Sequence, residues 1–116
     1  MLTGFAVIAA IATIVGLGFY FSGKEEDKII FFYSLTCPHC KVVEEYMAAN
    51  NTEAKIKMAK KEISESKANA DELVRKSAAC GIEPEEMGVP LLWNEGKCLV
   101  GDKDIINYFK EIDGNE

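Results

Sequence analysis

The fold is decided by residues 28–40, which read KIIFFYSLTCPHC. The first part of this stretch, residues 28–33, is one lysine followed by a continuous run of apolar, β-branched and aromatic side chains. Such a run predicts a strand that is buried on both faces. Pro38 suits the first turn of a helix. The stretch therefore predicts a strand, then a helix, with two cysteines where they meet.

The cysteine motif has the chemistry of a reactive thiol pair. Cys37 falls at or next to the N-cap, where free backbone N–H groups and the helix dipole favour negative charge. Cysteine thiols in such positions have pKa values of roughly 3.5–7.5 instead of about 8.5. His39 can add a positive charge or a hydrogen bond to the same sulfur, and Cys40 lies one turn deeper. Cys37, Pro38, His39 and Cys40 are therefore the predicted catalytic residues of a thiol–disulfide oxidoreductase.

A Cys-x-x-Cys pair has other uses. It forms half of many zinc sites, but the usual second half is another such pair or two histidines. This sequence has four cysteines and one histidine, and its other cysteines are not closely spaced. The preferred interpretation is therefore an enzyme with no metal site and no bound cofactor. A membrane-tethered protein that handles copper or zinc is the alternative, and an inert structural disulfide is disfavoured by the position at a helix start.

Two further elements are expected after the motif. The asparagines at 50–51 end the first helix, and residues 54–58 alternate between apolar residues and lysine. This alternation predicts a strand with one polar face. Asn69 and Glu72 resemble a capping box, which predicts a second helix that ends at Gly81.

The C-terminal part predicts a hairpin and a helix. Strands at 89–93 and 97–100 flank a turn at 94–96, and Asp102 caps a last helix. The expected α/β fold has the order β-α-β-α-β-β-α, with a four-stranded mixed sheet flanked by helices. The inner face of the last helix consists of Ile105, Ile106, Phe109 and Ile112.

The N-terminal segment predicts a membrane anchor. Residues 2–21 carry no charge, and a helix of that length spans roughly 30 Å, the hydrocarbon thickness of a bilayer. No Lys or Arg precedes the run, which ends in aromatic residues instead of a small-x-small cleavage site, so an uncleaved anchor is favoured over a signal peptide. The expected domains are an anchor at 1–22, a linker at 23–27 and a folded domain at 28–116.

The side of the membrane is weakly determined by the flanking charges. The flank at 24–28 carries two lysines and the N-terminal side of the run carries none, which leans toward a cytoplasmic domain, whereas the cysteine chemistry favours an oxidising compartment. We expect a single-pass protein with an extracytoplasmic domain. The net charge of −6 argues against a nucleic-acid partner. The lysine-rich patch is expected to be the solvated edge of a strand and contains Lys55, Lys57, Lys60 and Lys61.

Residues 28–112 resemble the thioredoxin superfamily. The resemblance rests on the strand, the CxxC pair, the helix and then Gly88-Val89-Pro90 before a hairpin and a final helix. The Pro-His dipeptide resembles that of DsbA-type oxidants, while the C-terminal half is more similar to the compact glutaredoxins.

The resemblance implies further site residues. Pro90 would be a cis proline packed against the cysteines, and Val89 would offer its backbone to an extended substrate. We also expect Thr36, next to Cys37, to contact substrate. Gly101 and Asp102 resemble the part of glutaredoxins that holds glutathione, which would make glutathione a co-substrate. The expected partners are protein thiols or disulfides and a membrane redox protein.

The other two cysteines allow two interpretations. Cys80 and Cys98 could form a second, structural disulfide, as an even cysteine count suggests in an oxidising compartment. They could equally be two separate buried thiols. Cys98 is also similar to an extra strand cysteine of some glutaredoxins.

Overall fold

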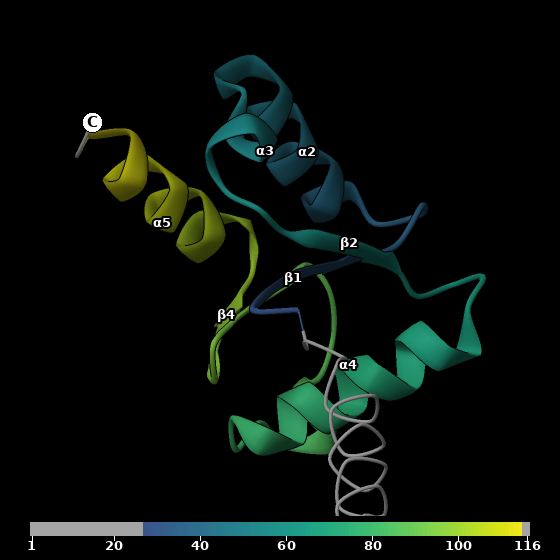
Figure 1. Ribbon diagram of the computed structural model, residues 1–116. Helices are drawn as coiled ribbons and strands as arrows, with labels where there is room; N and C mark the ends of the chain where they lie inside the picture. Colours follow the sequence, from purple (N-terminus) through teal and green to yellow (C-terminus); the bar gives the residue numbers. More distant parts are fainter. Residues whose placement is uncertain (1–26, 115–116) are drawn as a thin grey trace, which may run out of the picture.

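A four-stranded mixed sheet with the order β2-β1-β3-β4 is the centre of the structure, a computed structural model (Figure 1). Its strands are β1 (Ile29–Tyr33), β2 (Ala59–Glu62), β3 (Leu91–Asn94) and β4 (Lys97–Val100). β1 pairs parallel with β2 and antiparallel with β3, and β3 pairs antiparallel with β4. The predicted mixed sheet, with a parallel first pair and a closing hairpin, is confirmed.

The structure describes residues 27–114. The anchor expected at 1–22 and nearly all of the linker expected at 23–27 lie outside the described residues. Within 27–114, no helix has both the length and the apolar character that crossing a membrane requires.

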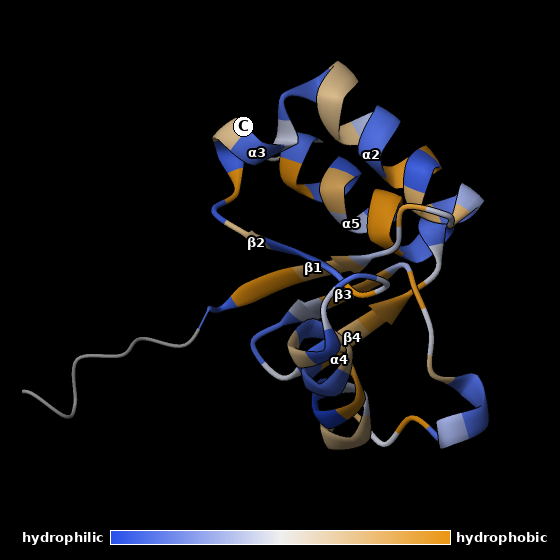
Figure 2. Cartoon of the chain, turned by 90° about the vertical axis from the view of Figure 1, so that its right-hand side faces the viewer, coloured by the Kyte–Doolittle hydropathy of each residue, from blue (hydrophilic) through white to orange (hydrophobic). Residues whose placement is uncertain are grey.

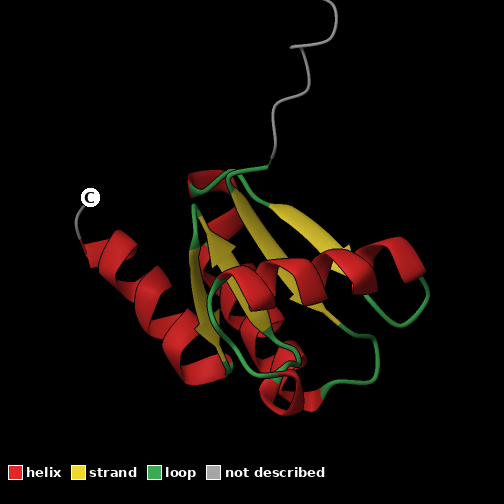
Figure 3. Cartoon of the chain, turned by 90° about the horizontal axis from the view of Figure 1, so that it is seen from below, coloured by secondary structure: helices red, strands yellow, loops and turns green. Residues whose placement is uncertain are grey.

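Helices cover both faces of the sheet (Figures 1 and 3). One face carries α2 (Pro38–Asn50), α3 (Thr52–Lys55) and α5 (Asp102–Gly114), and the other carries α4 (Lys67–Ala79). A short 3-10 helix, η1 (Pro84–Glu86), lies in the loop between α4 and β3.

The central strand β1 separates the core into two clusters. Phe31 packs with Val43 of α2 and Phe109 of α5. Its neighbours Ile30 and Phe32 point to the opposite face and join a cluster that includes Leu73 of α4. Since both faces of β1 are covered, the strand is apolar throughout, as predicted (Figure 2).

The strand predicted at 54–58 is wrong. α3 occupies Thr52–Lys55, and the second strand is Ala59–Glu62, with Ala59 opposite Ile30. Asn51 adopts a left-handed conformation with φ 52° and ends α2, and Ile56 is buried beneath α3 instead of pairing in the sheet. The true strand was missed because it lies at an edge of the sheet, where polar residues are favoured.

The N-cap predicted for α4 at Asn69 is also wrong. Ser66 is the N-cap, and its Oγ accepts the N–H of Asn69 at 3.2 Å. Asn69 lies inside the helix and its side chain donates to the carbonyl of Glu62 at 2.9 Å. The stop at Gly81 is confirmed, because φ is +77° there and the N–H of Ile82 bonds back to the carbonyl of Ser77.

The hairpin and the last helix are close to expectation. Glu95 and Gly96 have φ values of 47° and 97°, which are typical of a type I′ hairpin turn. Asp102 does not cap α5 from outside, because it is the first helical residue, and its carboxylate accepts the N–H of Lys103 at 2.9 Å. Ile105 and Phe109 are fully buried on the inner face of the helix.

Candidate active site

Cys37 and Cys40 form a disulfide at the start of α2, with their Cα atoms 5.2 Å apart. Cys37 is the N-cap residue, and Pro38 follows in the first turn. The backbone N–H of Cys40 donates to Cys37 Sγ at 3.1 Å. One of the free donors of the helix N-terminus therefore points at the sulfur that would carry negative charge after reduction.

The two cysteines differ in exposure. Cys40 lies in the first turn of α2 and is fully buried, whereas Cys37 is partly exposed. An external thiol would therefore reach the sulfur of Cys37 more easily than that of Cys40. Cys37 is therefore the more accessible of the two sulfurs, and Cys40 is the shielded one.

The loop before β3 borders the disulfide. The Val89-Pro90 peptide bond is cis, and the carbonyl oxygen of Val89 lies 3.7 Å from Cys37 Sγ. The carbonyl of buried Pro90 accepts the N–H of Gly101 at 3.0 Å. Residues far apart in the sequence therefore meet at one end of the sheet.

His39 points to Asp102 instead of to Cys37. Its Nδ1 lies 3.2 Å from Asp102 Oδ2, and its side chain is 72% exposed. The hydrogen bond from His39, helped by the N–H of Lys103, holds the pKa of Asp102 below its usual range. The expected direct contact from His39 to the sulfur is thus replaced by a link between the starts of α2 and α5.

The loop that leads into the motif is held by a residue the sequence analysis missed. The N–H of Leu35 donates to Glu62 Oε2 at 2.9 Å. Glu62 also accepts the hydroxyl of Ser64 at 2.7 Å and the N–H of Glu65 at 2.8 Å. These hydrogen bonds lower the pKa of Glu62 to about 2, and the bond from Ser64 has the largest effect.

Thr36, the predicted substrate contact, is exposed and lies in the same loop.

No local signal marks Glu62 in the sequence. Its position beside Leu35 follows from the parallel pairing of Tyr33 with Glu62 at the ends of β1 and β2. The strand predicted at 54–58 left Glu62 in a loop, so this contact could not be inferred.

The second cysteine pair lies on the other side of the sheet. Cys80, at the end of α4, and Cys98, in β4, form a disulfide with a Cα separation of 6.1 Å. Of the two interpretations of the sequence, this structure contains the disulfide. It joins α4 to the closing hairpin.

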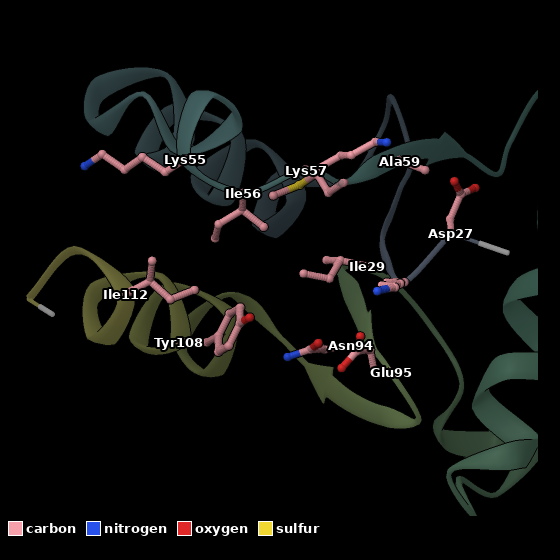
Figure 4. A pocket seen from close by; sticks show the side chains of 12 residues that line it. Asp27, Ile29, Lys55, Ile56, Lys57, Ala59, Asn94, Glu95, Tyr108 and Ile112 are labelled. Carbon is pink, nitrogen blue, oxygen red and sulfur yellow. The ribbon is translucent and has the colours of Figure 1, made fainter. Parts of the chain in front are cut away.

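A surface hollow is found at the opposite end of the sheet from the cysteine motif (Figure 4). Ile29 lies at the start of β1 and lines it, with Ile56, Tyr108 and Ile112, and charged side chains surround it. Cys37 follows the other end of the same strand, so the hollow is separate from the predicted site. Across residues 27–114, no group of three or more His, Cys, Asp or Glu side chains could hold a metal ion.

Two solved structures that are similar to this chain are glutaredoxins. A glutaredoxin from Archaeoglobus fulgidus is 17% identical, with a TM-score of 0.50, and the match covers 73% of this chain and 95% of that one. A dithiolic glutaredoxin from Trypanosoma brucei brucei is 21% identical, with a TM-score of 0.52, over 76% of this chain and 84% of that one. The chain therefore has a glutaredoxin-like α/β fold. No protein-family model and no curated protein matches the sequence.

Proposed function

We propose that this chain is a thiol–disulfide oxidoreductase that works through Cys37 and Cys40. The observation that carries the proposal is the position of Cys37 Sγ, which receives a helix N–H and borders the Val89-Pro90 loop. A thiolate formed there is stabilised by backbone donors. The glutaredoxin-like fold and the paired cysteines support the same chemistry in general terms.

The exchange proceeds in two balanced steps. A substrate thiolate attacks Cys37 Sγ, the Cys37–Cys40 bond breaks, and Cys40 leaves as a thiolate while a mixed disulfide forms with Cys37. A second substrate thiolate then attacks the substrate sulfur of the mixed disulfide and releases Cys37 as a thiolate. Two electrons pass from the substrate dithiol to the cysteine pair, and the two substrate thiol protons pass to solvent or to the new thiolates.

Protein thiols or disulfides are the proposed substrates. An extended peptide can pair with the backbone of Val89, which lies against the reacting sulfur. Glutathione is retained only as a proposed co-substrate at Gly101 and Asp102. Each carboxylate oxygen of Asp102 already accepts one hydrogen bond, from His39 or from Lys103, so an incoming amine would share this carboxylate with them.

The proposal includes a membrane anchor at residues 2–21, with the domain outside the cytoplasm. The uncharged run supports the anchor, and the Cys80–Cys98 disulfide supports an oxidising compartment. Cell fractionation tests the anchor: the full chain should stay in membranes after an alkaline wash. Release into the wash would reject the anchor without affecting the redox proposal.

The function is tested with a dithiol peptide and the oxidised full chain in detergent. Wild type should oxidise the peptide, Cys37→Ser should not, and Val74→Ser, an exposed change on α4, should match wild type. Equal oxidation by Cys37→Ser would contradict the proposal. Bound copper or zinc at one ion per chain, together with no exchange, would select the metal-handling alternative.

A further inference from the structure

Leu35 is an exposed apolar residue beside the reacting sulfur. Its side chain is 65% exposed, the largest value among the large exposed hydrophobic residues of the part that the structure describes. A single exposed leucine is ordinary on a protein surface. The position of Leu35 is unusual, because the residue lies only two positions before Cys37.

Local structure does not explain a leucine at this position. The N–H of Cys37 donates to the carbonyl of Ser34 at 3.2 Å, which closes a turn with Leu35 and Thr36 at its corners. Turn corners favour Gly, Pro, Asn, Asp and Ser, each for a backbone reason that leucine does not share. Burial does not explain it either, since most of the side chain faces solvent.

The turn is nevertheless held firmly. Glu62 accepts the N–H of Leu35 at 2.9 Å, and this bond joins segments 27 positions apart in the chain. Ser64 and Glu65 donate to the same carboxylate and fix its orientation. These donors lower the pKa of Glu62 to about 2, so the carboxylate stays ionised even in mildly acidic solution. The backbone of Leu35 is therefore held in place two residues before Cys37, and the residue itself stays exposed.

We propose that Leu35 is a specificity-determining residue that contacts an apolar side chain next to the reacting cysteine of a protein substrate, and that Glu62 positions it. This inference rests on the proposed function. It narrows the substrate class to polypeptides with a cysteine beside an apolar residue. Such contact would cover part of Leu35 while the substrate backbone lies along Val89.

The test compares two dithiol peptides that differ only in having Leu or Ser next to the first cysteine. Rates of peptide oxidation by the full chain are divided by the rate at which dithiothreitol reduces the same variant. Wild type should prefer the Leu peptide by about five- to twentyfold, the range expected from covering part of a leucine side chain. Leu35→Ser should lower this preference to about twofold or less, while Val74→Ser, the matched change at a 51% exposed position, should retain it.

The role of Glu62 is tested by a double-mutant cycle. Glu62→Gln should lower the Leu preference through KM for the Leu peptide, and adding Leu35→Ser should cause no further loss. Independent, additive losses would overturn the positioning role. An unchanged preference in Leu35→Ser would overturn the whole inference, yet leave the oxidoreductase proposal standing if both peptides are oxidised. If wild type oxidised neither peptide, the oxidoreductase proposal would be overturned as well.

Discussion

At the scale of single residues, the site combines a buried sulfur, a partly exposed sulfur and a hydrogen-bonded His–Asp pair. His39 and Asp102 join the starts of α2 and α5 at 3.2 Å, and the hydroxyl of Tyr46 in α2 donates to Asp113 in α5 at 2.8 Å. The carboxylate of Asp102 brings negative charge close to the motif. It therefore opposes the stabilisation that a positive His39 would give a thiolate at Cys37.

Asp102→Asn tests this balance. Removing the negative charge should favour the reduced, thiolate form, so the disulfide should become a stronger oxidant. The equilibrium with glutathione should shift toward reduced protein by about two- to fivefold, a size typical of exposed charge pairs. Asp104→Asn removes an exposed acid from the same first turn and is the control. A shift toward the oxidised form would contradict this account of the pair.

At the scale of elements, the sequence predicted correctly those helices and strands that are marked by one strong local signal. The apolar run of β1 and the helix that starts at Pro38 were predictable, because burial and a first-turn proline are strong local signals. The motif residues could therefore be chosen from these signals, whereas Pro90 was chosen from the family resemblance. The edge strand β2 was missed because its AKKE sequence has no apolar pattern. Glu62 was missed with it, since only strand pairing brings Glu62 to Leu35.

The start of α4 was also predicted wrongly from the sequence, and the N-cap that the structure shows there can be tested by mutation. The predicted cap was Asn69, whereas the N-cap in the structure is Ser66, three residues earlier. Ser66→Ala should lower the free energy of unfolding by about 0.5–2 kcal/mol, whereas Ser66→Gly should cost only a few tenths. Chemical denaturation of the full chain measures both. Equal losses for the two variants would argue against a side-chain cap.

At the scale of the whole molecule, the sheet separates the site from the point where the chain enters the domain. β1 runs from Ile29, near the linker, to Tyr33, which precedes the motif. Five residues of strand span roughly 17 Å. An anchor on the N-terminal side would therefore hold the domain by the end of the sheet that lies away from Cys37.

The second disulfide stabilises this arrangement from the α4 side. Its cysteines are 18 positions apart, and a loop of that size gives a stabilisation of about 2–4 kcal/mol. The double variant Cys80→Ala, Cys98→Ala should lose that much in denaturant unfolding and still exchange disulfides through Cys37. A complete loss of exchange in a folded double variant would show that the second pair takes part in the reaction.

The most direct measurement of the central claim is the trapping of a mixed disulfide. The reduced full chain, as Cys40→Ser or as Cys37→Ser, is mixed with a peptide disulfide, and the attached peptide is located by mass spectrometry. The account predicts a lasting peptide adduct on Cys37 in the Cys40→Ser variant and little adduct in the Cys37→Ser variant, since Cys40 is buried. A stronger adduct on Cys40 than on Cys37 would contradict it.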